Sequence, residues 1–186
     1  MKALRLFAAL ALLPLAAFAA DRAFKVDRSR SFVDVDVKAT VDSFTGHLDR
    51  YDAQIGLDAA GKPRTAVFTF KFADLKTGKP DRDAKMIEWL GGGDPEGQFT
   101  LGVLALTPDG QGQASGKLAF HGTAQLVEFP VNVTRDTDGT LTITGSTTID
   151  VRQWNLKVIR MALLLRVVPE VKIGLKIGGA PADAAK

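Results

Sequence analysis

The most regular feature of the chain is an alternation of apolar and polar side chains that begins near Ser31. In residues 31–38, valine occupies positions 33, 35 and 37, and Asp34, Asp36 and Lys38 occupy positions between them. Successive side chains of a β-strand point to opposite faces, so this pattern predicts a strand with one buried and one exposed face. The same period recurs at residues 46–58, 66–72, 98–106, 115–123, 126–135, 140–151 and 170–177. The chain is therefore predicted to be all-β, with about eight strands.

A different period interrupts the strands once, at residues 80–90. Met86, Trp89 and Leu90 are spaced there to form the apolar face of one short helix. Three consecutive glycines at residues 91–93 end it.

Short turns between the strands favour an antiparallel arrangement. Asp109-Gly110 and Asp138-Gly139 are strong hairpin-turn signals, and residues 152–156 predict an irregular or helical crossing around Trp154. Eight such strands are typical of a sandwich or an up-and-down barrel, and we favour the barrel because closure removes exposed edges. An eight-stranded barrel can be filled by its own side chains or can hold one small ligand, and the strand pattern alone leaves both open.

The first residues predict a secretory signal peptide. Lys2 and Arg5 precede an apolar run over residues 6–18 that is too short to cross a bilayer, and small residues follow it. We expect cleavage after Ala19, which leaves residues 20–186 as one exported domain without stable membrane insertion. No cysteine is present to carry a lipid anchor or a disulfide.

Charge and composition exclude several classes of function. Removal of Lys2 and Arg5 lowers the count of Lys and Arg from 24 to 22, against 21 Asp and Glu. These charges are interspersed and form no basic stripe, so nucleic acid is not an expected partner. With two histidines, His47 and His121, and no cysteine, we expect no metal, no cofactor and no catalytic triad.

An ordered set of short segments resembles the YceI-like family. The most informative segments are LAFHGT at residues 118–123 and VEFPV at 127–131. Supporting segments are FTGHL at 44–48, LKTG at 75–78, Arg82-Asp83, Asp94-Pro95 with Phe99, DVRQWNL at 150–156, and the closing strand at 170–177.

This resemblance implies an extended, eight-stranded, lipocalin-like barrel in the bacterial periplasm, with an ordered core at about residues 24–178. It also implies an apolar cavity that binds a polyisoprenoid or a similar long amphiphile, such as a polyprenyl phosphate or an isoprenoid quinone, often in a homodimer. Two positions depart from the family pattern: Ala84 stands where a histidine is frequent, and Asn155 stands where glycine is common.

The candidate ligand-binding residues are inward-facing apolar side chains and one polar pair. We expect the apolar set to line the cavity or, in the alternative, to fill a solid core. The set comprises Phe68, Phe70, Phe72, Met86, Trp89, Phe99, Leu101, Val103, Leu118, Phe120, Trp154 and Ile173. Arg82 and Asp83 are expected at the mouth, where they would contact a ligand head group or form an ordinary surface pair.

The remaining polar residues favour binding over catalysis. Asp34 and Asp36 are expected on the solvated face of their strand, and alternation places His121 outward. His47 shares the parity of Tyr51 and would face inward only if no bulge intervenes. Besides a lipid carrier, the sequence leaves open a solid-cored, secreted stress or interaction module. It also leaves open a lipid isomerase or cyclase, which needs a polar residue inside the barrel.

Overall fold

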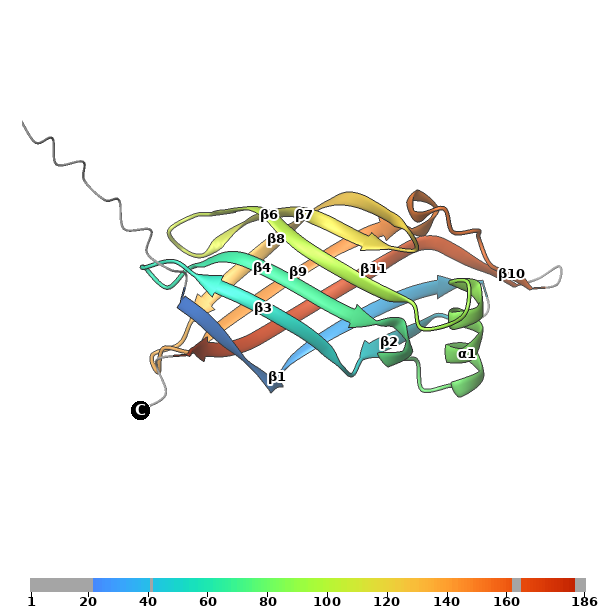
Figure 1. The fold of residues 1–186 in the computed structure, drawn as a ribbon, viewed down its shortest axis with the longest axis horizontal. Coiled ribbons are helices and arrows are strands. Elements are labelled where there is room, and N and C mark those ends of the chain that lie inside the picture. The colour runs from blue at the N-terminus through green and yellow to red at the C-terminus, as the bar shows by residue number, and fades with distance from the viewer. Residues whose placement is uncertain (1–21, 41, 162–164, 183–186) are drawn as a thin grey trace, which may run out of the picture.

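The computed structural model describes residues 22–40, 42–161 and 165–182, which form a closed, elongated antiparallel barrel (Figure 1). The strands are β1 (Arg22–Ala39), β2 (Phe44–Leu48), β3 (Tyr51–Leu57), β4 (Pro63–Lys71), β5 (Leu75–Lys76), β6 (Glu96–Leu106), β7 (Gln111–Phe120), β8 (Thr123–Arg135), β9 (Leu141–Asp150), β10 (Arg160–Met161) and β11 (Leu165–Pro181). Helix α1 spans Pro80–Trp89, and 3-10 turns span Phe72–Asp74 and Val151–Trp154.

Pairing of the first and last long strands closes the barrel. β11 pairs with β9 on one side and with β1 on the other. β3 pairs with the beginning of β1 and β2 pairs with its end, so β2 and β3 share one position in the wall. The predicted eight-stranded, lipocalin-like barrel with one short helix is confirmed.

The alternation in β1 has the predicted orientation. Val33, Val35 and Val37 line the interior. On the outer face, the Asp34 carboxylate lies 2.8 Å from Nδ1 of His47, and Asp36 accepts a hydrogen bond from Thr45 at 2.6 Å. Each of these polar contacts joins directly opposed residues of β1 and β2, as cross-strand pairing requires.

The predicted strand at residues 46–58 is two strands, because residues 49–50 leave the ladder. The backbone N–H of Asp49 donates to the carbonyl oxygen of Asp74, and Arg50 forms an ion pair with the buried Asp74 carboxylate at 2.6 Å. The break shifts the alternation by one residue, so Leu48 and Tyr51 are both buried while His47 is exposed.

Strand ends also differ from the predictions. β1 begins at Arg22 rather than near Ser31, and β11 begins at Leu165 rather than Glu170. The predicted strand 115–123 ends at Phe120, because His121 and Gly122 have φ values of 49° and 70° and form a tight two-residue turn between β7 and β8.

A β-bulge in β6 overturns one predicted orientation. Leu101 pairs with Gly116 and Val103 pairs with Ser115, so Gly102 is an extra residue in the ladder. Phe99 and Leu101 remain partly buried, whereas Val103 is 64% exposed. The expectation that Val103 faces the interior is wrong for this reason.

The end of the barrel that carries the described chain termini is filled by its own side chains. Phe24, Leu57, Leu141 and Ile177 are buried there in one apolar cluster. Arg28 lies over the Tyr51 ring at the edge of the same cluster, with its guanidinium carbon 3.8 Å from the ring centroid. No helix in the described part of the chain has both the length and the hydrophobicity needed to span a bilayer.

One polar atom in this packed cluster gives a direct test of the structure. The Tyr51 hydroxyl is buried without a hydrogen-bond partner, which is unfavourable because its desolvation is not compensated. We expect Tyr51→Phe to raise the free energy of unfolding by about 1 kcal/mol and the melting temperature by about 2–4 °C. Thermal denaturation followed by circular dichroism measures both.

The control is Trp154→Phe, which removes a polar group that does have a partner. Nε1 of the fully buried Trp154 donates to the carbonyl oxygen of Leu118 at 3.1 Å. This variant should be destabilised by about 1–3 kcal/mol. A lower melting temperature for Tyr51→Phe would contradict the packing described around its hydroxyl.

Candidate functional site

A cavity of about 710 Å³ occupies the end of the barrel that carries α1. Its walls are inward-facing side chains of β1, β4, β7, β9 and β11, and they are almost entirely apolar. The solid-core alternative therefore does not describe this half of the barrel. A volume of this size lies within the range typical of small-molecule sites.

Helix α1 forms one side of the cavity near its mouth. Pro80 at the first helical turn suits the start of a helix because its ring fixes φ and its missing N–H would have no helical partner there. Met86, Trp89 and Leu90 line the cavity, as the helical spacing predicted. The indole N–H of Trp89 donates to the carbonyl oxygen of Lys157 at 2.7 Å, which ties the helix to the segment after β9.

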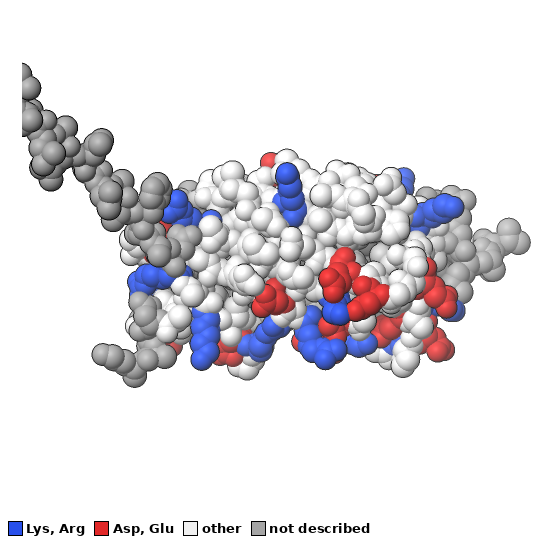
Figure 2. Space-filling model, in the orientation of Figure 1, with Lys and Arg blue, Asp and Glu red and all other residues white. Residues whose placement is uncertain are grey.

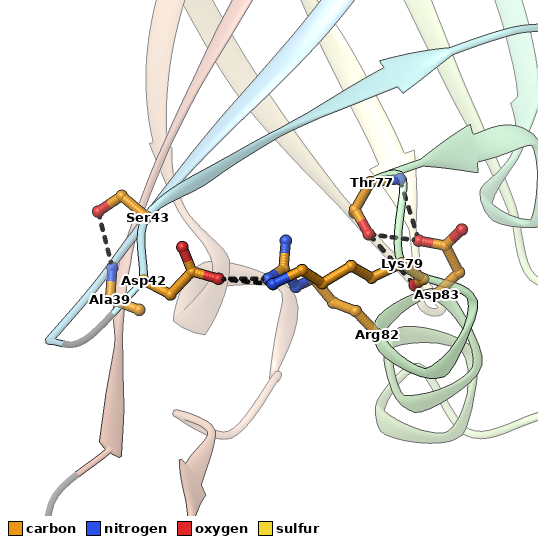
Figure 3. Close-up of polar contacts among 7 residues, drawn as sticks. All are labelled: Ala39, Asp42, Ser43, Thr77, Lys79, Arg82 and Asp83. Carbon is orange, nitrogen blue, oxygen red and sulfur yellow. Dashed lines mark hydrogen bonds and ion pairs between the residues drawn. The ribbon is translucent and has the colours of Figure 1, made fainter.

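The mouth of the cavity carries a small network of charges that joins two separate parts of the chain (Figure 3). Asp42, in the loop between β1 and β2, accepts from Arg82 at 2.7 Å and from Lys79 at 3.2 Å. The Arg82 guanidinium also lies over the Phe44 ring, 3.9 Å from its centroid. All four residues line the cavity. We call Asp42, Lys79 and Arg82 the mouth network.

Asp83 has a different position from its neighbour. Its carboxylate accepts hydrogen bonds from the backbone N–H of Thr77 at 3.0 Å and from the Thr77 hydroxyl at 2.7 Å, as Figure 3 shows. These contacts fold the chain back at the start of α1. Asp83 does not line the cavity, so of the predicted polar pair the structure brings only Arg82 to it.

Of the predicted apolar residues, the structure gathers seven around the cavity: Phe70, Phe72, Met86, Trp89, Leu118, Phe120 and Ile173. Phe68, Phe99, Leu101 and Trp154 instead pack behind or beyond its wall, and Val103 is on the outer surface. Trp154 stacks on Phe120 with ring centroids 4.7 Å apart, so it supports a wall residue from behind.

Among the cavity residues that sequence reasoning missed, two groups differ in whether the sequence could have identified them. Val33, Val35 and Val37 line the cavity, and their strict alternation could have identified them. Val158, Ile159 and Val167–Pro169 also line it, from the segments on either side of residues 162–164. No strand or helix period marks that second group, so the sequence offered no comparable signal.

The histidines do not contribute to the interior. His47 is 64% exposed on the outside of β2. His121 donates from Nδ1 to the carbonyl oxygen of Trp154 at 2.9 Å and so joins the β7–β8 turn to the turn after β9. Within the described ranges, no group of three or more His, Cys, Asp or Glu side chains is arranged to hold a metal ion.

Asn155, where the family resemblance leads one to expect glycine, ends the 3-10 turn that follows β9. Its φ is 61°, a left-handed conformation that glycine adopts freely and asparagine tolerates better than most residues. Its side-chain amide donates to the Thr123 hydroxyl at 3.0 Å. Asparagine at this position is therefore compatible with the left-handed conformation of the turn.

A family model of the YceI-like domain matches residues 24–178. The chain belongs to the YceI-like family. The resemblance found in the sequence is thus confirmed.

Solved structures support the same fold for this YceI-like protein. Burkholderia cenocepacia BcnA is similar, with 21% identity and a TM-score of 0.69 over 83% of this chain and 99% of that one. A polyisoprenoid binding domain from Saccharophagus degradans, implicated in plant cell wall breakdown, has 17% identity and a TM-score of 0.66, covering 86% of this chain and 99% of that one. A Campylobacter jejuni YceI protein has 16% identity and a TM-score of 0.60, covering 74% of this chain and 85% of that one. Comparison with curated protein sequences gives no significant match.

The mouth network makes a pH-dependent prediction. Lys79 and then Arg82 hold the pKa of the Asp42 carboxyl below its ordinary value. Because the pKa of Asp42 is lower in the folded protein than in the unfolded chain, these contacts stabilise the folded state at pH values above the unfolded pKa. This stabilisation is lost as the pH falls through the lower pKa of the folded state. An NMR titration of the Asp42 side chain should give a midpoint below the ordinary pKa of an aspartate side chain.

Matched substitutions identify the cause of this shift. Lys79→Met and Arg82→Met should each raise the Asp42 midpoint, whereas Lys62→Met, in the turn between β3 and β4, should leave it unchanged. An Asp42 midpoint that does not respond to either mouth substitution would show that the network does not form in solution.

Proposed function

We propose that this YceI-like protein binds a polyisoprenoid or a similar amphiphilic lipid, with the apolar tail in the barrel cavity and the head group at the mouth. The observation that carries the proposal is the 710 Å³ apolar cavity with its charged groups gathered at one opening. Such a site suits a molecule that is apolar along most of its length and polar at one end.

Burial alone supplies enough free energy for this function. Each CH₂ group transferred from water contributes about 0.8 kcal/mol, so a five-carbon isoprene unit contributes roughly 3–4 kcal/mol. Association costs about 4–15 kcal/mol, and several buried units exceed it. Tight binding therefore requires a tail of several units and a dry cavity, without any reactive residue.

The mouth network suits a polar head group. Arg82 is 22% exposed and already paired with Asp42, so a head group that enters must share or replace that carboxylate. A phosphate would compete with the Asp42 carboxylate because it forms a bidentate pair with the Arg82 guanidinium. A quinone carbonyl oxygen would accept hydrogen bonds from the same cationic groups. Asp81 and Lys85 also line the cavity and add one negative and one positive charge there.

The family and one structural neighbour support a lipid ligand. The chain belongs to the YceI-like family, and a structural neighbour with a TM-score of 0.66 is described as a polyisoprenoid binding domain. Both agree with an apolar interior in which the described polar side chains are confined to the mouth.

The protein is proposed to hold its ligand rather than convert it. Asp83 is bonded to Thr77 and does not line the cavity, and both histidines are outside it. The two carboxylates that do line the cavity are Asp42, which is paired with Arg82, and the exposed Asp81 in the first turn of α1. A lipid isomerase or cyclase needs a proton donor or acceptor beside the reacting carbons. Ligand recovered from the protein should accordingly be chemically unchanged.

Binding can be tested by filling the cavity. Ile173→Trp adds a large ring to a wall residue and should reduce retention of a prenyl lipid at least tenfold, measured by native mass spectrometry after gentle purification. Val103→Trp is the matched control, since it adds the same ring to the outer surface.

The two variants should have similar circular dichroism spectra and should differ only in bound lipid. Equal retention by both, or absence of prenyl lipid from the unmodified protein even after incubation with it, would refute the proposed function.

Residues 1–19 lie outside the described part of the chain. We propose that they are a signal peptide, and that the protein is therefore periplasmic. Expression of the full chain in a Gram-negative host should give a periplasmic product whose intact mass lacks residues 1–19. Replacing Ala17 and Ala19 with bulky residues should block this processing. A cytoplasmic product of full mass from the unchanged chain would contradict the proposed location.

A further inference from the structure

The cavity ends part-way along the barrel, at a floor made by aromatic rings. Phe70 lines the cavity, whereas Phe68, two residues earlier on β4, does not. The two ring centroids are 6.1 Å apart, and Phe68 in turn stacks on Tyr51 at 4.5 Å. Beyond these rings lie Phe24, Leu57, Leu141 and Ile177, in the packed cluster at the other end of the barrel.

The rings of the floor are held on several sides. Gly97 lies opposite Phe70 on β6, and a side chain at Gly97 would collide with the Phe70 ring, so the ring rests directly against the backbone. The Arg28 guanidinium packs on the Tyr51 ring at 3.8 Å. Tyr51 belongs to the same buried cluster as Leu141 of β9 and Ile177 of β11, and Phe68 and Phe70 pack against this cluster. The three rings of β3 and β4 and this cluster together form the floor of the cavity.

The volume above this floor limits the length of an apolar tail. A methylene group is about the size of a water molecule, whose share of liquid volume is about 30 Å³, so a five-carbon isoprene unit needs about 150 Å³. The 710 Å³ cavity therefore accommodates between four and five units. Any further unit would have to stay outside the mouth, next to water and the charged groups of the mouth network.

We infer that the barrel selects its ligand by tail length and accepts isoprenoid tails of up to about five units, with Phe68 and Phe70 setting the limit. This inference rests on the proposed function and adds to it an upper size for the ligand. A unit left in water loses the contribution of its burial, which corresponds to at least a tenfold loss of affinity per unit.

A competition experiment tests the limit. The protein is incubated with phosphatidylcholine vesicles that contain an equimolar mixture of linear prenyl alcohols of three to nine isoprene units, then separated and analysed by native mass spectrometry. A tail that fits moves from one apolar environment to another, so alcohols of three to five units should be recovered at similar levels. Recovery should fall at least tenfold for each unit beyond the fifth.

Two substitutions should move the limit. Phe68→Ala removes a six-carbon ring from behind the floor, slightly more than one isoprene unit, and should extend the range by one unit. Phe70→Ala removes a ring from the cavity side and should have the same effect, which keeps the test available if one variant folds poorly. Phe24→Ala, in the packed cluster at the far end, is the control and should leave the limit unchanged.

The outcomes separate this inference from the proposed function. Recovery of the nine-unit alcohol at the level of the four-unit alcohol would overturn the length limit while leaving lipid binding intact. A limit that neither Phe68→Ala nor Phe70→Ala moves would overturn the assignment of the floor. Recovery of no alcohol of any length would overturn the proposed function itself.

Discussion

The interior of a closed eight-stranded barrel receives every second side chain of each strand except where a bulge shifts the alternation, and this constraint decides which side chains can fill or line the interior. At the end near α1, the pairing of β1 with β11 brings short aliphatic residues together, with Val35 opposite Ile173 and Val37 opposite Val171. At the other end, aromatic and long aliphatic residues meet across the axis. Short aliphatic side chains on the β1–β11 side of the cavity thus leave space opposite larger wall residues such as Phe70 of β4 and Phe120 of β7.

The charged groups at the mouth matter more for where they lie than for their contribution to the stability of the fold. Water screens exposed ion pairs, so the pairs of Asp42 with Arg82 and Lys79 add little to the stability of the fold. They do connect the β1–β2 loop to α1 at the point where a ligand would enter.

Figure 2 shows acidic and basic side chains intermixed at the end of the barrel that carries α1, while the broad flank above it is nearly free of charge.

The family and the barrel could be predicted because their signals are local and repeated. Two-residue alternation marks strands independently of what they contact, and Asp-Gly pairs mark the turns between them. The direction of individual side chains was less predictable. One extra residue at Gly102 turns Val103 outward, and two residues drawn toward Asp74 shift the alternation between β2 and β3.

The site itself was only partly accessible from the sequence. Helical spacing identified Met86, Trp89 and Leu90, and alternation identified Phe70, Phe72 and Phe120. Alternation could not separate Phe68 from Phe70, since both face inward and only depth along the barrel axis distinguishes them. That depth depends on the tilt of the strands and on the residues that pack against each ring, such as Tyr51 of the neighbouring strand β3, and neither is encoded in a two-residue period.

The division of the barrel into a packed half and a hollow half reconciles stability with binding. Apolar walls that enclose unfilled volume lack the contacts that would otherwise stabilise them, so the hollow half is a cost to the ligand-free fold. The cluster around Phe24, Leu57, Leu141 and Ile177 offsets this cost at the opposite end, with Leu57 wholly inaccessible to solvent. A ligand that fills the cavity restores the missing contacts and stabilises the folded state by about 2.7 kcal/mol at a free concentration of 100 times its Kd. The same aromatic rings that hold the packed half together also form the floor of the cavity, so the protein cannot admit a longer tail without giving up part of the packing that keeps it folded when empty.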